Sequence, residues 1–314
     1  MSKANTAVNN NHVQSSDGTR WSPEERPCPG CGSNAIRNFG SRGGEAHRHG
    51  KGIKTTIVQC LHCEVIYTKP TLIPLDNPYD THSAEEYFQM HDSQIKTSAG
   101  EDLAAFAEEV LGTKGKMLEI GCGRGELLLG ALNRGWSVYG IEMTEEFAEV
   151  ARSKGIDIEQ SSVEQSKSLH HQTYDVILLA AILEHLYDPI SILNKVRAAL
   201  RPGGLVFIDV PNERSLTMRM GNCYMRLRGT DWTVNLSPTF SPFHVVGFSP
   251  QSLAAVLNST GFRVLHIGTE RWNNSLPEGK GLINRVERLG LYAIQKVGSI
   301  LNMADGIRCW AVRE

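Results

Sequence analysis

A turn rich in glycine is the stretch of this sequence with the clearest chemical meaning. Gly121, Gly123 and Gly125 follow a short apolar run at 116–120 and precede a helical pattern. Glycine lets the backbone turn sharply and lets a ligand approach it without meeting a Cβ atom. Glu126 would repel a pyrophosphate at the start of that helix. The turn therefore favours a cationic ligand, such as a sulfonium carrying an amino acid and adenosine, over a dinucleotide.

Acidic and small residues around this turn fit the parts of such a ligand. Glu119 lies just before the glycines and can interact with an ammonium group, directly or through water. Glu142 ends the next expected strand, where a carboxylate can accept hydrogen bonds from both hydroxyls of a ribose. Ser162 and Val163 follow the third strand and are expected on the adenine side. Ala180, at the end of the fourth strand, is assigned to the same site.

Two histidines are candidates for a general base. Glu184 and His185 follow the fourth expected strand, and an imidazole titrates near neutral pH. His244 lies in a long insert after the fifth strand, and loops of this kind often carry functional residues. We take His185 as the first candidate and His244 as the second, with Glu184 beside His185. The alternative is structural: Glu184 then anchors the following turn, and His244 stabilises its loop.

Four of the seven cysteines form two Cys-x-x-Cys pairs, Cys28 with Cys31 and Cys60 with Cys63. Four thiolates in two tight turns are typical of a tetrahedral zinc site. Because the protein fills all four positions, none remains open for chemistry, and the expected zinc is structural. The alternatives are two incidental thiol pairs or a redox pair, although neither pair opens the strand-to-helix unit of a redox motif.

From about residue 100 the chain alternates between strand and helix patterns. This alternation predicts a doubly wound α/β fold, with helices on both faces of a parallel sheet. Strands are expected at 116–120, 137–141, 156–159, 174–179, 205–210, 262–267 and 307–312. Helices are expected at 101–111, 125–133, 145–153, 191–200, 249–259 and 282–301, with Thr144 as a cap. Ligands of such sheets bind at the carboxyl ends of the strands, where the glycine turn and His185 are expected.

Four stretches resemble the class I S-adenosylmethionine-dependent methyltransferases in order and spacing, namely 119–125, 139–142, 174–189 and 200–205. The resemblance covers about residues 100–270. It implies a seven-stranded Rossmann-like sheet whose last strand, here at 307–312, is antiparallel. It also implies contacts of S-adenosylmethionine with Gly121, Gly123 and Glu142. The family often has an acidic residue after the third strand, whereas this sequence has Ser162 there.

The N-terminal part predicts a smaller unit. Residues 1–22 are expected to form a disordered tail, and residues 23–70 a zinc-ribbon-like unit with a mobile loop at 40–52. Residues 71–98 are expected to form a helical connector. Residues 99–314 are expected to form the catalytic domain, with an insert at 212–247. The connector carries a capping box at Ser83 and Glu86. The layout resembles methyltransferases with an N-terminal zinc ribbon and a Tyr-Phe helix, matched by Tyr87 and Phe88. Sugar C-methyltransferases share it, but they usually carry a further C-terminal domain.

Composition limits the partners and the location. The net charge of −2 argues against a general polyanion binder, and no segment reaches the roughly 18 apolar residues that span a bilayer. The N-terminus lacks the apolar core of a signal peptide, so a cytoplasmic location is expected. The helix at 282–301 carries Arg285, Arg288 and Lys296 among leucines and isoleucines. Packing against the domain is its expected role, and contact with a membrane surface is the alternative.

The expected activity is methyl transfer to a small molecule or to a glycan or sugar-nucleotide precursor. O-methylation is favoured because a histidine base suits a hydroxyl. The insert combines arginines with Trp232, which suits a phosphate, carboxylate or sugar-nucleotide acceptor, or else a solvated lid. One alternative is an RNA methyltransferase that grips nucleic acid with its locally basic ribbon. The other is a non-catalytic interaction protein built on the same fold.

Overall fold

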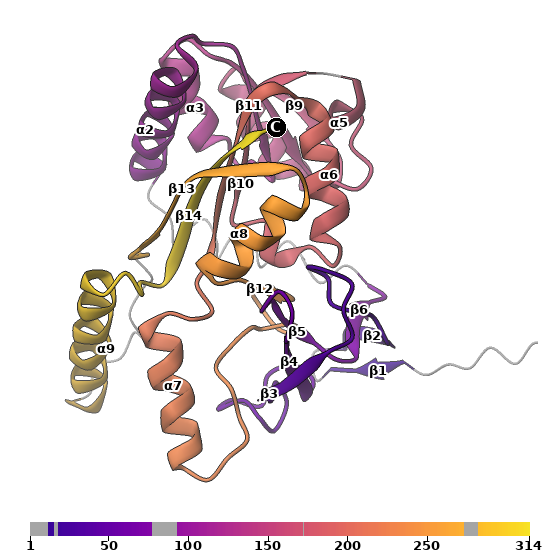
Figure 1. Ribbon diagram of the computed structural model, residues 1–314, viewed down its shortest axis with the longest axis vertical. Helices are drawn as coiled ribbons and strands as arrows, with labels where there is room; N and C mark the ends of the chain where they lie inside the picture. Colours follow the sequence, from indigo (N-terminus) through magenta and orange to yellow (C-terminus); the bar gives the residue numbers. More distant parts are fainter. Residues whose placement is uncertain (1–11, 16–17, 77–92, 172, 273–281) are drawn as a thin grey trace, which may run out of the picture.

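The computed structural model describes residues 12–15, 18–76, 93–171, 173–272 and 282–314 (Figure 1). Its largest element is a seven-stranded sheet in the order β13-β14-β11-β10-β7-β8-β9. The strands are β7 (Lys116–Ile120), β8 (Ser137–Glu142), β9 (Asp157–Gln160), β10 (Tyr174–Ala180), β11 (Leu200–Pro211), β13 (Phe262–Glu270) and β14 (Gly306–Arg313). Strands β7 to β11 pair in parallel, and β14 is antiparallel to both of its neighbours. The predicted doubly wound sheet with an antiparallel last strand is confirmed.

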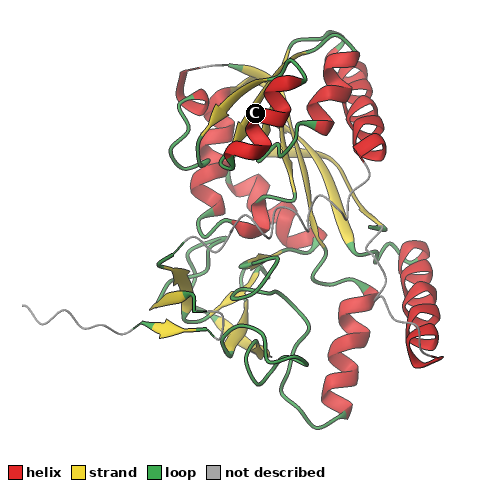
Figure 2. Cartoon of the chain, turned by 180° about the vertical axis from the view of Figure 1, so that it is seen from behind, coloured by secondary structure: helices red, strands yellow, loops and turns green. Residues whose placement is uncertain are grey.

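Helices cover both faces of this sheet, as Figure 2 shows from behind. The helices of one face are α2 (Ser93–Leu111), α3 (Glu126–Asn133) and α4 (Glu145–Ser153), and those of the other are α5 (Ser168–His171), α6 (Pro189–Ala199) and α8 (Pro250–Ser259). The central strand β10 lies between these two layers of helices. Val176 and Leu178 pack toward α2, α3 and α4, whereas Ile177 and Leu179 pack toward α5, α6 and α8. A strand buried on both faces needs the continuous apolar run that its sequence carries.

Short polar side chains begin the helices that follow the strands. Asp188 Oδ1 accepts a hydrogen bond from Ser191 N at 3.0 Å and caps α6. Ser249 caps α8 in a reciprocal pair with Ser252. Thr144 occupies the cap position of α4 as predicted, but its hydroxyl caps none of the described backbone amides. Glu142, the last residue of β8, accepts from Thr144 N instead.

The N-terminal unit consists of two small sheets. One has the order β12-β5-β4-β3, with β3 (Ile36–Arg42), β4 (Thr55–Cys60), β5 (Ile66–Thr68) and β12 (Val246–Gly247). The other has the order β1-β2-β6, with β1 (Val13–Gln14), β2 (Arg20–Glu24) and β6 (Thr71–Pro74). Strand β12 belongs to the insert of the catalytic domain, and Val246 pairs with Tyr67 of the ribbon. The two parts of the chain therefore share one sheet.

The structure differs from the tail expected at 1–22 in the part that it describes. Trp21 of β2 is 1% exposed, and its Nε1 donates a hydrogen bond to Ser15 Oγ. Strand β2 pairs with the short β1 on one side and, on the other, with β6, which lies about fifty residues later in the chain. Local composition cannot reveal a pairing with so distant a strand. Residues 1–11 and 16–17 lie outside the described residues.

The glycine-rich loop at 40–52, predicted to be mobile, is packed against the insert. A Cβ atom at Gly40 would lie 2.6 Å from Asp231 O, and one at Gly52 would lie 2.4 Å from Thr239 Oγ1. Ala46, in the middle of the loop, is 1% exposed. The glycines therefore permit a close approach of two backbones, and the prediction of a mobile loop does not match these contacts.

The connector predicted at 71–98 contains β6 at its start, and α2 already begins at Ser93. Its predicted helix, with Ser83, Glu86, Tyr87 and Phe88, lies outside the described residues. The insert contains a helix that the sequence patterns did not reveal, α7 (Leu216–Leu227), and α7 lies beside α9 (Leu282–Ile300) (Figure 1). Among the described residues, every helix is too short or too polar to cross a bilayer.

Candidate active site

The glycine turn forms between β7 and α3 as predicted. Gly121, Gly123 and Gly125 have φ angles of 66°, 54° and 72°. A Cβ atom at Gly121 would lie 2.2 Å from Ile182 Cδ1, and one at Gly125 would lie 2.4 Å from Ile156 Cδ1. At Gly123 a Cβ atom would meet no described atom within 4 Å. Gly123 is therefore the point of the turn that faces open space, where a ligand can approach the backbone.

Glu142 lies against this turn at the end of β8. Its Oε2 accepts a hydrogen bond from Gly123 N at 2.9 Å, and its Oε1 accepts one from Thr144 N at 2.8 Å. The residue is 6% exposed, so the carboxylate is held in one position. Each carboxylate oxygen can accept more than one hydrogen bond. The ribose diol of a nucleoside can therefore still donate to it.

Glu119 of β7 lies just before the turn and is 4% exposed. Burial raises the pKa of this carboxyl well above its usual range, and the nearby Glu126 and Glu142 raise it further, whereas Lys96 opposes them. Its Oε2 has no hydrogen-bond partner among the described residues. A cationic group bound at this place would stabilise the carboxylate.

Glu126 begins α3 and pairs with Arg124, whose Nε lies 2.7 Å from Glu126 Oε1. The pair neutralises the charge that was expected to repel a pyrophosphate. The Arg124 guanidinium thus offsets the charge that Glu126 would present to a pyrophosphate, and the preference for a cationic ligand stays a prediction.

The residues expected on the adenine side lie at the same edge of the sheet. Ser162 and Val163 follow β9, and Ala180 ends β10. Ser161 N donates to Glu142 O at 3.1 Å, which holds this segment beside β8. Val163 is buried in the core that includes β7 and β10.

Glu184, His185 and His244 come together beyond the end of β10. The first two lie in the short 3-10 helix η1 (Leu183–His185), and His244 comes from the insert. The Nε2 atoms of both histidines lie 3.9 Å from Glu184 Oε1. The two rings meet edge to face, with their centroids 4.9 Å apart. The structure thus joins the three predicted catalytic residues in one cluster.

The backbone of the insert fixes this cluster. His185 Nδ1 lies 3.3 Å from Phe243 O, and a carbonyl oxygen only accepts hydrogen bonds. In the neutral ring the proton is therefore on Nδ1, and the lone pair is on Nε2, on the side of Glu184. Val245 N donates to Glu184 O at 2.9 Å. Phe243 and Val245, on either side of His244, therefore hold η1 in place through these two contacts.

Burial sets the protonation of the cluster. It raises the pKa of Glu184 to about 8, and Asp209 and Glu213 contribute in the same direction. Burial also lowers the pKa of His185 to about 4 and that of His244 to about 3. Both imidazoles are therefore neutral at pH 7 and can accept a proton. Neither carboxylate oxygen of Glu184 has a hydrogen-bond partner among the described residues.

Two further acids belong to this region, and the sequence analysis missed both. Asp209 of β11 lies beside Ala180, and burial raises its pKa to about 7. Glu213 is buried as well, with a pKa raised to about 7, and accepts a hydrogen bond from Asn235 Nδ2 at 2.6 Å. Asp209 could have been found from the sequence, because an acidic residue within the apolar strand at 205–211 is unusual. Glu213 had no such signal.

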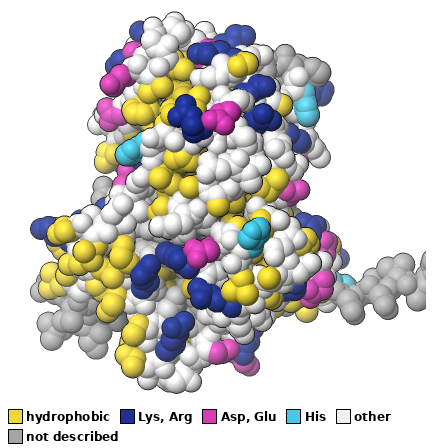
Figure 3. All heavy atoms as spheres, viewed as in Figure 1, with side chains coloured by type: hydrophobic (Ala, Val, Ile, Leu, Met, Phe, Trp, Pro, Cys, Tyr) yellow, Lys and Arg dark blue, Asp and Glu magenta, His cyan; other side chains and the backbone are white. Residues whose placement is uncertain are grey.

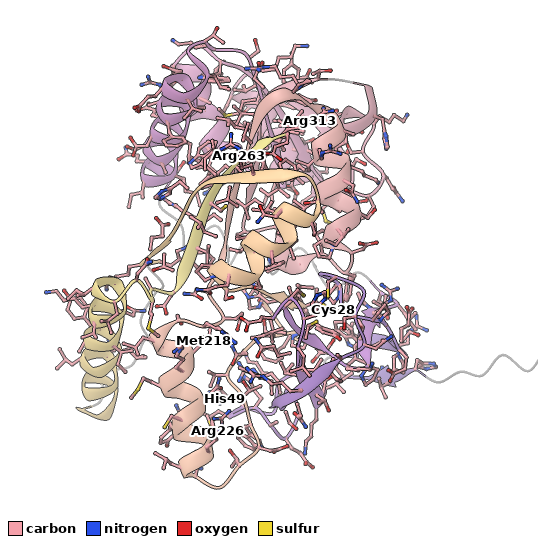
Figure 4. The ribbon with its side chains drawn as sticks, in the orientation of Figure 1. Cys28, His49, Met218, Arg226, Arg263 and Arg313 are labelled. Carbon is pink, nitrogen blue, oxygen red and sulfur yellow. The ribbon has the colours of Figure 1, made fainter. Side chains whose placement is uncertain are left out.

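The four cysteines form one cluster. Cys28 Sγ lies 3.4 Å from Cys63 Sγ, Cys31 Sγ lies 3.5 Å from Cys60 Sγ, and all four sulfur atoms lie within 4.8 Å of one another. Thiolates about 2.3 Å from a tetrahedral ion would lie roughly 3.8 Å apart. The donor set therefore fits one tetrahedral metal ion. Figure 4 shows Cys28 on the side of the ribbon that faces the catalytic domain.

Two equivalent turns build this cluster. Gly32 and Glu64, which follow the second cysteine of each pair, have φ angles of 72° and 64°. Gly30 N lies 3.4 Å from Cys28 Sγ, and His62 N lies 3.3 Å from Cys60 Sγ. Amide donors directed at sulfur stabilise thiolates, so both turns are arranged for ionised cysteines.

The ribbon also packs against residues next to the cluster of Glu184, His185 and His244. A cavity of about 510 Å³ lies between the ribbon and the catalytic domain, and its lining includes Tyr67, Tyr187 and Val245. Tyr187 follows η1, and its hydroxyl donates a hydrogen bond at 3.0 Å to Leu72 O of strand β6. Val245 is the residue directly after His244. The ribbon therefore reaches the immediate neighbours of both histidines.

Comparison with known proteins places the chain in a family. A family model described as a methyltransferase domain matches residues 91–267. The ubiquinone biosynthesis O-methyltransferase of Hydrogenovibrio crunogenus is 28% identical over 186 residues, which is 57% of this chain and 75% of the relative. The protein of the same name from Aeromonas salmonicida is 31% identical over 156 residues, which is 48% of this chain and 63% of the relative.

Solved structures show the same fold. The plantazolicin methyltransferase BpumL in complex with SAH matches with a TM-score of 0.51 at 16% identity, over 76% of this chain and 91% of that chain. A SAM-dependent methyltransferase from Archaeoglobus fulgidus matches with a TM-score of 0.50 at 22% identity, over 74% of this chain and 100% of that chain. This chain belongs to the methyltransferase domain family and is a class I S-adenosylmethionine-dependent methyltransferase.

Proposed function

We propose that the protein transfers a methyl group from S-adenosylmethionine to a hydroxyl oxygen of a small molecule or of a glycan or sugar-nucleotide precursor. The observation that carries the proposal is the buried carboxylate of Glu184 with the Nε2 atoms of His185 and His244 each 3.9 Å from it. Relatives named ubiquinone biosynthesis O-methyltransferase support transfer to oxygen.

The side chain of His185 is 21% exposed, whereas that of Glu184 is buried behind it. The hydroxyl of the acceptor would donate its proton to Nε2 of His185 at about 2.8 Å, a normal hydrogen-bond distance. As the new oxygen–carbon bond forms and the sulfur–carbon bond breaks, the hydroxyl proton passes to Nε2 of His185. The carboxylate of Glu184 then stabilises the imidazolium. His244, at the same distance from Glu184, is the second candidate base.

The paired cations of the ribbon favour a small acceptor over RNA. Arg26 pairs with Glu24, and Arg37 donates to Gln59 Oε1. Arg42 is largely buried and donates to Leu236 O at 3.1 Å. These three arginines contributed to the locally basic character of the ribbon, and their partners reduce their availability to phosphates.

The test is a methyl-transfer assay with labelled S-adenosylmethionine and extracts of small metabolites or of RNA. We expect the label in a small molecule, in a linkage that resists the acid and base treatments that release methyl esters. Label in RNA, or on carbon or nitrogen, would contradict the proposal.

The proposed S-adenosylmethionine site combines Gly121, Gly123 and Gly125 with the acids Glu119 and Glu142. Glu142 is assigned to the ribose and Glu119 to the ammonium group, since Glu142 is held against Gly123 N and one oxygen of the buried Glu119 has no described partner. Ser162, Val163 and Ala180 complete the site on the adenine side.

We expect Glu142→Ala to weaken S-adenosylmethionine binding by about tenfold to a hundredfold. A hydrogen bond to a charged group contributes roughly 1.5–3 kcal/mol, and the variant also loses the anchor of Gly123 N. Isothermal titration calorimetry measures the affinity. Glu145→Ala, at an exposed position on α4, is the matched control and should bind as the wild type does. Equal affinities of wild type and Glu142→Ala would remove Glu142 from the site.

The same proposal assigns a structural zinc ion to Cys28, Cys31, Cys60 and Cys63. The sulfur distances and the two equivalent turns support it. The zinc would hold the ribbon sheet to which β12 is joined, and thereby the segment that carries His244.

A further inference from the structure

Helices α7 and α9 present several large apolar side chains to solvent. Leu227 is 82% exposed, Ile300 is 79% exposed and Leu289 is 70% exposed. Met220, Tyr224, Tyr292, Val297 and Leu301 are exposed as well. A helix that only packs on its domain turns such residues toward the core. These two helices do the opposite.

The sides of the helices that face the protein come close to their neighbours at two glycines. A Cβ atom at Gly221 would lie 2.9 Å from Val234, and one at Gly298 would lie 2.9 Å from Met303 O. Gln295 is 8% exposed, although it is polar. Asn222 Nδ2 donates to Asn235 Oδ1 at 2.6 Å. Both helices therefore make close contacts with the protein at these points, while the apolar side chains named above stay exposed to solvent.

The exposed side chains form a stripe on each helix. Met220, Tyr224 and Leu227 are spaced by four and three residues, which places them on one face of α7. On α9, Leu289, Tyr292 and Ile300 share the exposed side. The two helices pack on each other, because a Cβ atom at Gly298 would lie 3.4 Å from Leu216 Cβ. We call these two stripes together the α7–α9 face.

Cations border this face. On α7, Arg219 and Arg226 lie on one side of the apolar stripe, and Arg228 lies over Tyr224, 5.7 Å from its ring centre. On α9, Lys296 lies 5.9 Å from the ring centre of Tyr292. Helix α7 contains neither Asp nor Glu, and the sequence of α9 contains one acidic residue, Glu287. Figure 3 shows hydrophobic side chains gathered over α9, with Lys and Arg nearby, and Figure 4 labels Arg226 on α7.

We propose that the α7–α9 face docks on the surface of an anionic lipid bilayer. Apolar side chains bordered by arginine and lysine are typical of helices that lie in the interface, with the apolar stripe among the acyl chains and the cations at the headgroups. The described helices cannot cross a bilayer, so the protein lies on the surface. A second copy of the chain fits less well, because a symmetric contact would bring two cationic faces together.

Docking would orient the active site. Helix α7 follows the carboxyl end of β11, which is the edge of the sheet that also carries the glycine turn and η1. The insert that carries α7 also carries His244. The bilayer would therefore lie on the side of the molecule from which the acceptor approaches, and an acceptor with an apolar part could reach the site from the lipid.

Co-sedimentation with vesicles tests the proposal on the full chain. We expect the wild type to sediment with vesicles of mixed phosphatidylglycerol and phosphatidylcholine, to bind pure phosphatidylcholine at least about tenfold more weakly, and to dissociate as salt is raised. Leu227→Asp and Ile300→Asp should each lower the partition coefficient by about tenfold or more, because each removes a large apolar side chain from the lipid. Arg226→Glu should weaken binding to the anionic vesicles alone.

The matched control is Val110→Asp, an exposed apolar residue at the end of α2 that leads into β7. It should bind vesicles as the wild type does. Calorimetric titration with S-adenosylmethionine shows whether each variant is folded. Equal sedimentation of wild type and Leu227→Asp, or equal binding to neutral and anionic vesicles, would overturn the proposal. So would a wild-type dimer, seen by light scattering, that Leu227→Asp dissociates.

Discussion

Replacing Glu184 by glutamine should lower the rate of methyl transfer at saturating substrate concentrations by about a hundredfold or more. General base catalysis contributes roughly 10²–10⁴-fold, and the imidazolium formed at His185 would lose the only carboxylate at 3.9 Å that the described residues supply. The affinity for S-adenosylmethionine should change little, because Glu142 and Glu119 are untouched. Glu146→Gln, at an exposed position on α4, is the matched control.

The same variant should change the pH profile. Burial raises the pKa of Glu184 to about 8, so the carboxyl is mostly protonated below that pH and charged above it. The groups that face it are His185, His244, Asp209 and Glu213, and both imidazoles stay neutral well below pH 7. The wild-type rate should therefore rise with pH around a midpoint near 8. In Glu184→Gln this rise should disappear, and a midpoint that persists there would contradict the assignment.

Replacing Cys28 by serine should remove the metal and unfold the ribbon. Structural zinc stabilises small peptide units by about 10–16 kcal/mol, and the ribbon has only a small core of its own. Elemental analysis should show one zinc per chain in the wild type and a loss in the variant, together with a lower melting temperature. Cys223→Ser is the matched control, because Cys223 is exposed on α7 and outside the cluster.

The rate of methyl transfer should fall in Cys28→Ser much more than the affinity for S-adenosylmethionine. His244 precedes β12, which pairs with β5 of the ribbon, whereas the glycine turn depends on the large sheet alone. Equal zinc contents in Cys28→Ser and Cys223→Ser would contradict the assignment of the cluster. So would a rate that is unchanged after the zinc has been removed.

The features that could be predicted from the sequence are local ones. The turn at Gly121, Gly123 and Gly125 depends on residues next to one another, and the alternation of strands and helices repeats over short distances. The predicted bounds of α4 and β7 agree with the structure for this reason. The cysteine spacing likewise predicted that four distant sulfur atoms would meet.

The features that could not be predicted depend on distant partners. His185 and His244 were proposed separately, and only the fold shows that both face one oxygen of Glu184. Strand β12 has two residues and gains its structure from Tyr67, far earlier in the chain. The loop at 40–52 looked mobile because its glycines gave no sign of the insert against which they pack.

The pairing of Val246 with Tyr67 has a consequence for acceptor selection. One residue, Val245, separates His244 from a strand that completes the ribbon sheet, so the ribbon cannot swing away as a gate without displacing the proposed base. In the proposed reaction the acceptor would bind beside a ribbon whose position relative to His244 is fixed, so ribbon side chains that take no part in proton transfer would contribute to acceptor choice. Substitutions there could redirect the enzyme to new acceptors while its reaction stays the same.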